Sequence, residues 1–353
     1  MKHTQRAFGL DFIRVSAILS VIASHFFLHT GFQNYEFRGI SMFLQAILKF
    51  FFGIGVPLFI LLTGYLNCHK EATLKYYLGG KKVLSLYLFW SIVTCLYLVE
   101  RSDVEIIKAI KGIISFSTIR YGWYIEMWIG LFLLIPFLNI MWQNCPTKSQ
   151  KRLLLGILFV MTCIPNYTNQ YGHLTPAYWR VCYPLFFYFS GAYIREYQPQ
   201  MRKLWWYLIG GICLTAPTLN ALFVSNSIFV QYTGEPNGIF GAIISIIFFV
   251  LCYKFDTKKQ QVSWFFAIVS IASLEMYLCS YMFDVALYPK FQGILHWNDA
   301  SSAGKYFLIV VPIIFTCALT AAFLRRECSK RLVRFAQALY SFRCKKSRRS
   351  SIR

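Results

Sequence analysis

The sequence predicts an all-α polytopic membrane protein, and three observations favour this class. Of its 353 residues, 57% are hydrophobic and only 14% are charged. The hydrophobic residues occur in blocks that are longer than the core segments of a globular domain. Basic residues alternate with these blocks, so positively charged membrane loops explain the net charge of +22 better than nucleic-acid binding does.

About ten blocks are apolar enough to be considered membrane-spanning helices. The fifth is the weakest, because its clean apolar run from Leu153 to Ile164 is shorter than the ~20 residues that a straight span needs. The sequence contains no visible repeat, linker or second soluble domain. The expected spans are residues 7–29, 42–66, 82–99, 122–142, 152–166, 178–195, 203–224, 237–254, 263–283 and 304–324.

The distribution of Lys and Arg predicts that both termini are cytoplasmic. With the N-terminus inside, the cytoplasmic segments hold 26 of these residues and the opposite segments hold 9, while Arg14 remains inside the first span. The imbalance persists through every pair of loops, which favours an even number of spans. We therefore expect a multi-pass protein of the cell inner or plasma membrane, with an integral-membrane domain at 1–324 and a basic cytoplasmic tail at 325–353.

Two shorter segments are predicted to lie on membrane surfaces. In residues 106–113, isoleucines recur at helical spacing opposite two lysines, which is typical of a short helix on the outer surface. The tail is expected to form an amphipathic helix on the anionic inner leaflet, and a solvated charged tail is the alternative. The apolar residues that recur in the tail are Leu332, Phe335, Leu339 and Phe342.

The eleven cysteines are scattered singly, and no Cys-x-x-Cys pair occurs. Most of them lie inside apolar blocks or on the side that we assign to the cytosol. Cysteines in this pattern behave as small buried hydrophobic residues. The sequence therefore predicts neither a disulfide framework nor a metal cluster.

Polar residues within the first span indicate where chemistry takes place. Arg14 and His25 are eleven residues apart, and at about 100° per residue they share one face of a helix to within roughly 20°. The helical rise separates them by roughly 16 Å along the axis. Asp11 lies one turn before Arg14, close to the same face. Charged and titratable groups are costly in lipid, so we expect this stripe to face a protein interior or a wet cavity.

Several blocks resemble the membrane-bound acyltransferase-3 family. Arg14 and His25 match its Arg-x10-His signature, and Thr63 stands where the family's second block usually has Ser. Ser280 occupies the place of a late histidine of the family. The other resembling blocks, in order, are Gly55–Leu66 (like VPLFF-x-x-SGY), Gly122–Ile125 (like WYL), Phe187–Tyr193 (like YF-x-x-G) and Ser273–Leu278 (like S-x-x-IYL).

This resemblance implies an O-acyltransferase of the stand-alone, integral-membrane type. Such enzymes move an acyl group, usually acetyl from acetyl-CoA, to a hydroxyl of a cell-surface glycan or a lipid-linked sugar. The expected partners are therefore the acyl-CoA donor, the saccharide acceptor and membrane lipid. No nucleic acid is expected.

His25 is the expected general base. A neutral imidazole can take the proton of a poorly nucleophilic sugar hydroxyl as it attacks a thioester. The alternatives are a buried structural histidine or one at the outer rim of the helix. His29 lies one turn further, at metal-ligand spacing, but no third ligand is evident and we expect no metal.

Arg14 offers a fixed positive charge and a planar fork of donors suited to phosphate or carboxylate. It is predicted to bind part of coenzyme A or to polarise the thioester oxygen. An ion pair with Asp11 is the alternative, and both roles are compatible. We expect the donor to enter from the cytosol and to extend toward His25 through one water-reachable chamber that both side chains share.

Glu126 and Glu275 lie inside predicted spans, where acids are costly and are candidates for function. Glu126 is predicted to pair with Arg14 or to orient His25. For either acid, a bond to a neighbouring helix is the alternative. The remaining candidates are Tyr277, Ser273 and Glu275 for the acceptor, Trp123 and Tyr124 for the donor's pantetheine arm, and Lys81 and Lys82 for its phosphates; packing, interface anchoring and membrane orientation are their alternatives.

Two other functions remain open. A transporter or flippase would use Arg14, His25 and the intramembrane acids to line a substrate or proton path. The sequence has no visible inverted repeat or paired broken helices, which disfavours a transporter. Within the same family, the acceptor would alternatively be a small molecule or a lipid.

Overall fold

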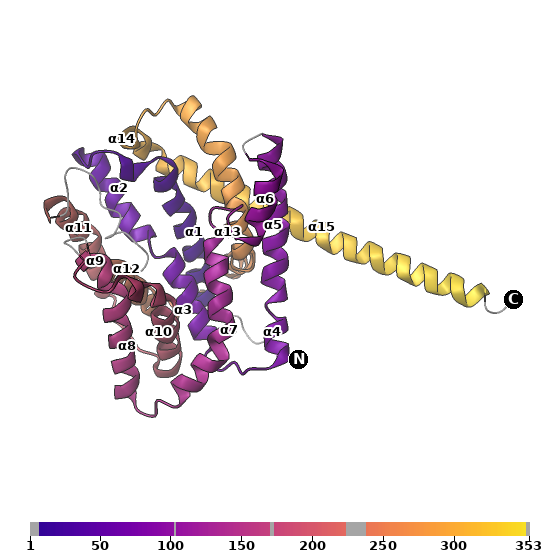
Figure 1. Ribbon diagram of the computed structural model, residues 1–353, viewed down its shortest axis with the longest axis horizontal. Coiled ribbons are helices and arrows are strands. Elements are labelled where there is room, and N and C mark those ends of the chain that lie inside the picture. The colour runs from indigo at the N-terminus through magenta and orange to yellow at the C-terminus, as the bar shows by residue number, and fades with distance from the viewer. Residues whose placement is uncertain (1–6, 102–103, 170–172, 224–237, 351–353) are drawn as a thin grey trace.

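The computed structural model describes residues 7–101, 104–169, 173–223 and 238–350, with side chains throughout except at 216, 217, 219–223 and 332–350. These residues form an all-helical protein without a strand in the described ranges. Figure 1 shows a bundle of helices from which the last helix, α15, extends far to one side. The helices are α1 (Phe8–His29), α2 (Gly39–Phe52), α3 (Gly55–Asn67), α4 (Leu74–Leu78), α5 (Lys81–Glu100), α6 (Ile106–Ile114), α7 (Trp123–Gln143), α8 (Lys148–Cys163), α9 (Pro165–Thr168), α10 (Tyr183–Tyr197), α11 (Trp205–Phe223), α12 (Ile239–Cys252), α13 (Gln260–Leu295), α14 (Ala300–Ala303) and α15 (Phe307–Ser350).

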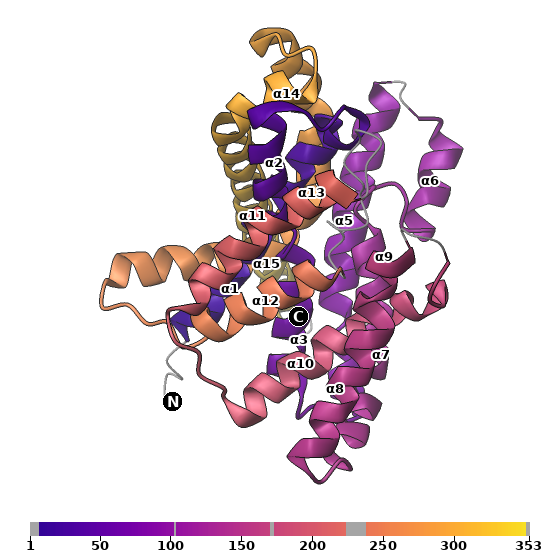
Figure 2. The ribbon, with the colours of Figure 1, turned by 90° about the vertical axis from the view of Figure 1, so that its left-hand side faces the viewer.

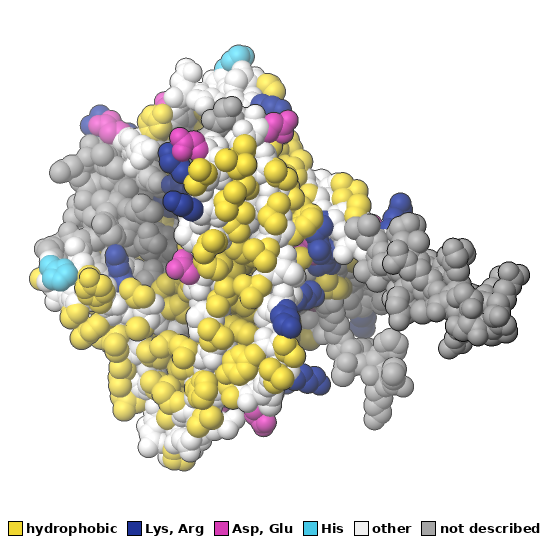
Figure 3. All heavy atoms as spheres, turned by 45° about the vertical axis from the view of Figure 1, so that its right-hand side comes forward, with side chains coloured by type: hydrophobic (Ala, Val, Ile, Leu, Met, Phe, Trp, Pro, Cys, Tyr) yellow, Lys and Arg dark blue, Asp and Glu magenta, His cyan; other side chains and the backbone are white. Residues whose placement is uncertain are grey.

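Six helical segments in the described ranges are long and apolar enough to cross a membrane. They confirm the predicted class of polytopic helical membrane protein, with apolar side chains gathered on the surface and basic side chains along the margin of this face (Figure 3). The predicted total of ten spans and the orientation of the termini are not confirmed. The six segments are Phe8–Asn34, Gly39–Asn67, Leu74–Glu100, Trp123–Gln143, Gln260–Leu295 and Ala300–Arg331.

The fifth to eighth predicted spans correspond to shorter helices, and among the described residues only α12 and part of α11 count as apolar. Helix α8 has 16 residues, α10 has 15 and α12 has 14, all fewer than a straight span needs. The apolar part of α11 that counts toward a span is Trp205–Thr215. Hydropathy alone was sufficient to locate these four helices in the sequence. It did not give their lengths, because the hydropathy pattern does not show where turns end each helix.

Helix α1 is the centre of the bundle. It packs against α2, α3, α12, α13 and α15, and most of its apolar side chains are buried. Gly55 permits the close approach of α3, because a Cβ atom there would lie 2.9 Å from the Ala17 carbonyl oxygen and 2.7 Å from a Val21 methyl. The polar stripe of α1 is therefore enclosed by neighbouring helices.

The second predicted span is broken into α2 and α3 at Gly53 and Ile54. The sequence did not predict this break. A broken helix at membrane depth needs other partners for its backbone groups. Ser24 on α1 supplies one, since its hydroxyl donates a 2.8 Å hydrogen bond to the carbonyl of Phe52. The break consequently brings backbone of the second span beside the stripe of α1.

The short surface helix predicted at 106–113 is present as α6, beside α5 at the edge of the bundle (Figure 2). Of the predicted apolar face, Ile106 and Ile110 are exposed, as expected for a helix lying on a membrane surface, whereas Ile113 packs partly against the core. The backbone of the tail is helical as the continuation of α15. The amphipathic face predicted there, at Leu332, Phe335, Leu339 and Phe342, lies outside the described side chains.

Gly191→Ala is expected to destabilise the protein. Helices α3 and α10 pack closely, and a Cβ atom at Gly191 would collide with the Leu61 carbonyl oxygen. Overpacking of this kind costs about 1–3 kcal/mol, so the melting temperature in detergent should fall.

Gly130→Ala in α7 is the matched control, because no atom lies within 4 Å of a Cβ atom at that position. Alanine has the higher helix propensity, so this control should melt at the same temperature or higher. Equal losses in the two variants would contradict the close packing of α3 on α10.

Candidate functional site

One cavity, of about 220 Å³, encloses much of the predicted site. It lies between α1, α3, α5, α7 and α13. Four predicted residues line it together: Arg14, Tyr124, Ser273 and Tyr277. We refer to it as the Arg14 cavity. Its tyrosines come from α7 and α13, so Tyr124, which was predicted for the donor, meets Ser273 and Tyr277, which were predicted for the acceptor.

Arg14 has both a structural contact and access to this cavity. One of its terminal nitrogens donates a 2.9 Å hydrogen bond to Ser270 and lies 3.8 Å from the buried carboxylate of Asp11. The Arg14 side chain is still 26% exposed. The ion pair with Asp11 therefore exists, and the guanidinium remains accessible to a ligand.

The Arg14 cavity continues into a second, wider space, which we call the vestibule. The vestibule has a volume of about 570 Å³ and shares Thr63, Asn67, Val83 and Trp128 with the Arg14 cavity. Its other lining residues include His69, Lys70, Glu71 and Lys75. These residues belong to the loop between α3 and α4 and to the start of α4, so the vestibule connects Arg14 with this segment, which the sequence analysis predicted to be cytoplasmic.

A third space, the His25 cavity, has a volume of about 330 Å³. It is lined by α1 residues around His25, by both sides of the break between α2 and α3, and by Trp123. Two cations, Lys49 and Arg120, also line it, with no carboxylate among the described lining residues. The His25 cavity therefore favours ligands that carry negative charge.

His25 faces a buried acid from α13 that the sequence analysis missed. Its Nδ1 atom is 3.4 Å from Oδ2 of Asp284, and the Asp284 side chain is completely buried. Nδ1 has no geometrically formed hydrogen bond among the described atoms. This contact directs one ring nitrogen toward Asp284 and leaves Nε2 as the nitrogen available to a substrate hydroxyl.

Tyr121 completes the surroundings of the imidazole. Its ring stacks on His25 with 3.6 Å between centroids and 19° between planes. Its hydroxyl donates a 2.6 Å hydrogen bond to Asp284 and lies 2.7 Å from Nε2 of His29. Burial and the Asp284 carboxylate raise the pKa of Tyr121 well above its usual range, so Tyr121 stays protonated and remains a donor.

Arg14 and His25 do not share one chamber, which corrects the sequence-based expectation. They line two separate cavities whose common residue is Tyr277. The Tyr277 hydroxyl donates a 2.6 Å hydrogen bond to the backbone carbonyl of Tyr121, which fixes the ring between the cavities. Arg14 and His25 therefore border different cavities, and Tyr277 lines both.

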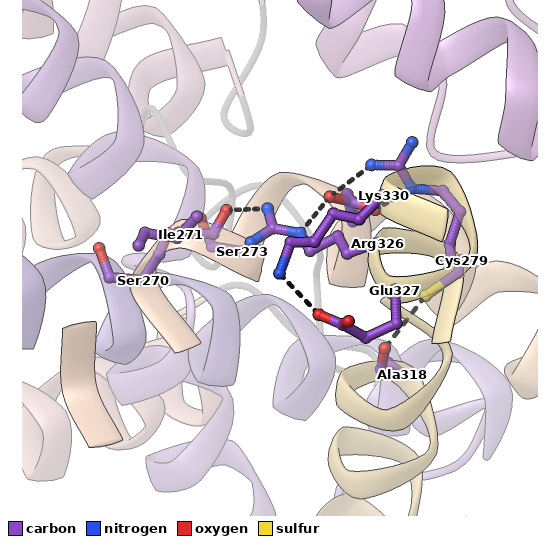
Figure 4. A network of polar contacts seen from close by, with 10 residues as sticks. Ser270, Ile271, Ser273, Cys279, Ala318, Arg326, Glu327 and Lys330 are labelled. Carbon is purple, nitrogen blue, oxygen red and sulfur yellow. Dashed lines mark hydrogen bonds and ion pairs between the residues drawn. The ribbon is translucent and has the colours of Figure 1, made fainter. Parts of the chain in front are cut away.

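Other predicted residues lie apart from these cavities. Glu126 is exposed on α7, and Asp284 occupies the place beside His25 that was expected for it. Glu275 is buried and pairs with Arg325 and Arg326 of α15. Figure 4 shows Arg326 reaching across to α13. No structural observation tests a role for Glu126 or Glu275, and both roles stay predictions.

The residues that were predicted to contact the donor line different cavities. Tyr124 lines the Arg14 cavity, whereas Trp123 lines the His25 cavity. Lys81 and Lys82 are both exposed, and Lys82 lines a different cavity beside α15. Their role in binding phosphates therefore remains a prediction.

A simple sequence signal could have identified Asp284. It follows Tyr281-Met282-Phe283 and precedes another apolar run, so it is an intramembrane acid like Glu126. The predicted span stopped at residue 283, whereas α13 continues to Leu295. Tyr121 carried no such signal, because a tyrosine before a span is typical of an interface anchor.

Ser280 occupies the position of the family's late histidine. It is fully buried, and its hydroxyl donates to the carbonyl of Tyr277 one turn earlier. Asp284 lies one turn further along the same helix. In this chain, the titratable group that α13 presents to His25 is therefore a carboxylate.

His25 and His29 both approach Oδ2 of Asp284, at 3.4 and 3.7 Å. In the part of the chain that the structure describes, no group of three or more His, Cys, Asp or Glu side chains is arranged to hold a metal ion. The two histidines instead share one carboxylate.

Comparison with known proteins gives one match. The family model described as "Acyltransferase domain" (Acyl_transf_3) matches residues 8–324, from the start of α1 through the apolar part of α15. This confirms the resemblance based on the Arg14–His25 signature and the later blocks. No curated protein and no solved structure matches the chain significantly.

Tyr277→Ala is expected to join the two cavities. In a chain whose cysteines outside the buried core (Cys145, Cys182, Cys317 and Cys328), together with Cys344, are replaced by Ser, a charged thiol reagent should label Thr63→Cys from the vestibule face and Ser24→Cys from the opposite face. Adding Tyr277→Ala should make each cysteine reactive from both faces. Labelling of vesicles from either side measures this.

Tyr277→Phe is the matched control, because it keeps the ring and removes only the hydroxyl. It should preserve one-sided labelling more fully than Tyr277→Ala. Two-sided labelling of both cysteines with Tyr277 intact would rule out the dividing wall.

Proposed function

Because the chain belongs to the acyltransferase-3 family, we propose that this membrane acyltransferase moves an acetyl group from acetyl-CoA to a hydroxyl of a cell-surface glycan or its lipid-linked precursor. The observation that carries the proposal is the pair of cavities that meet at Tyr277. One begins at a basic vestibule, and the other is lined by His25, whose imidazole contacts the buried Asp284. This arrangement suits two substrates that approach from opposite faces of a plasma or inner membrane.

The donor is proposed to enter through the vestibule. Lys70 and Lys75 line its mouth and can meet the phosphates of coenzyme A. The pantetheine arm would then extend past Arg14 and Tyr124 toward Tyr277. The Arg14–His25 separation of roughly 16 Å along a continuous helix suits an extended arm of this kind.

The position of Arg14 favours one of its two predicted roles. Arg14 lines the donor cavity, whereas His25 lies beyond Tyr277. An arginine at that depth is well placed to hold part of coenzyme A by hydrogen bonds. It is less suited to polarising a thioester that reacts beside His25.

His25 is proposed to act as the general base. As the acceptor hydroxyl attacks the thioester carbonyl, Nε2 takes its proton; the carbon–sulfur bond then breaks, and the coenzyme A thiolate regains a proton from the imidazolium. The buried carboxylate of Asp284 orients the ring and stabilises the imidazolium while it exists. Tyr277 has to swing aside for the acyl end to reach this position.

The acceptor is proposed to bind in the His25 cavity. Trp123, whose side chain is 42% exposed, offers an aromatic face on which a sugar ring can pack. Lys49 and Arg120 suit a phosphate or carboxylate on that saccharide. A lipid-linked saccharide has both parts, since its carrier phosphate lies next to the sugar.

His25→Ala is expected to lower the rate of acyl transfer by about 10²- to 10⁴-fold, the usual contribution of a general base. Asp284→Asn should also lower the rate strongly, because it keeps the shape of the side chain but removes the charge that orients the ring and stabilises the imidazolium. Transfer of labelled acetyl from acetyl-CoA in membranes measures both variants and Arg14→Ala.

His296→Asn is the matched control. His296 is exposed, lines neither substrate cavity and has a positive φ of 52° that asparagine also tolerates, so transfer should be unchanged. Normal transfer by well-folded His25→Ala would remove the proposed base. Substrate flux into vesicles without any acyl transfer would instead support the transporter alternative.

Lys70→Gln combined with Lys75→Gln is expected to raise the KM for acetyl-CoA by about tenfold or more, because a hydrogen bond to a charged group contributes about 1.5–3 kcal/mol. The KM for acetyl-pantetheine, which lacks the phosphates, should not change. Steady-state kinetics with the two donors separates the effects.

Lys81→Gln is the comparison variant, since this exposed lysine lines none of the three cavities on the proposed path. A rise in KM for acetyl-CoA in Lys81→Gln, with none in the vestibule variant, would move phosphate binding to the residues predicted from the sequence.

A further inference from the structure

A separate cavity, of about 730 Å³, lies between α5, α13 and α15. We call it the basic cavity. It has four cationic side chains and two carboxylates, and therefore a net charge of +2; they are Lys82, Arg325, Arg326 and Lys330 with Glu275 and Glu327. No described lining residue belongs also to the Arg14 cavity or the vestibule. The proposed path of the donor therefore does not account for this charge.

The arginines of this cavity are held in place by Glu275. Its carboxylate is 1% exposed and accepts 2.5 Å hydrogen bonds from Nε of both Arg325 and Arg326. Arg326 also donates to the Ile271 carbonyl at 2.6 Å, as Figure 4 shows. One carboxylate cannot neutralise two guanidinium groups, so a positive charge remains in a fixed position.

Both arginines retain a capacity to bind a ligand. A guanidinium has five N–H donors. The bonds to Glu275 and Ile271 use Nε and one terminal nitrogen of each arginine among the described residues. The second terminal nitrogen of each remains for an acceptor, and phosphate oxygens match this fork geometry.

The surroundings of the basic cavity are apolar. Ile271 is 48% exposed, and Phe89, also exposed, lies beneath the Arg325 guanidinium at 5.7 Å from the ring centroid. Arg325 and Arg326 follow directly on the apolar run of the last span. Cationic side chains at the end of an apolar span are typical of the depth at which a lipid headgroup meets its acyl chains.

We propose that the basic cavity binds the phosphate of an anionic phospholipid, whose acyl chains lie along the exposed apolar side chains of α5 and α13. The charge selects an anion, and the apolar surroundings select a lipid over a soluble phosphate compound. Binding would join α15 to α13 and α5 at the membrane surface. The site is independent of the proposed acyl transfer.

Lys82→Gln combined with Lys330→Gln tests the site while leaving the Glu275 network intact. The purified full-length protein would be titrated with phosphatidylglycerol or phosphatidylcholine, and the bound lipid counted by native mass spectrometry. The wild type should prefer phosphatidylglycerol, and the double variant should lose about fivefold in that preference for each lysine removed.

Lys258→Gln combined with Lys259→Gln is the matched control. It removes the same charge from exposed lysines outside the cavity and should keep the preference. Equal losses in the two double variants, or a wild type without preference, would overturn the site. Displacement of phosphatidylglycerol by coenzyme A would also overturn it, because the bound phosphate would then be the donor's.

Discussion

The proposed chemistry depends on one buried carboxylate. Asp284 is removed from water and shared by Tyr121, His25 and His29, so a single acid fixes three side chains from α1 and the segment before α7. Removing a carboxylate from water is costly unless it is paired and hydrogen-bonded. Stacked rings and a short bond from a protonated phenol offset that cost and hold the imidazole in one orientation. The His25 cavity therefore has an imidazole of fixed orientation in its wall.

The second constraint is the close packing of α1 by glycine-containing helices. Gly55 lets α3 approach α1, and Gly64 and Gly191 let α3 approach α10. The break between α2 and α3 then exposes backbone to a wet cavity, with Ser24 satisfying a freed carbonyl. Because the helices are this close, the space between them divides into small cavities, and one ring, Tyr277, is sufficient to separate two of them.

The charged side chains follow this division of the interior into separate cavities. The vestibule and the His25 cavity carry cations at the two ends of the path, while Arg14 is restrained halfway by Asp11 and Ser270. Outside the proposed path of the donor, the ion pairs of Glu275 with Arg325 and Arg326 join α13 to α15. Intramembrane acids thus have different consequences: Asp284 contacts the histidine that lines a substrate cavity, whereas Glu275 pairs with two arginines of α15.

The sequence by itself determined the helical membrane class, the family and the shared face of Arg14 and His25, because hydropathy and helical periodicity are local properties. It also selected Tyr124 as a donor contact and Ser273 and Tyr277 as acceptor contacts, but it did not indicate that all three line one cavity with Arg14. Only the tertiary structure decided that Asp284 rather than Glu126 faces His25, that Glu275 pairs with α15, and that Tyr277 divides the path. These outcomes depend on how helices are rotated and where they break, and long-range packing rather than residue spacing controls both.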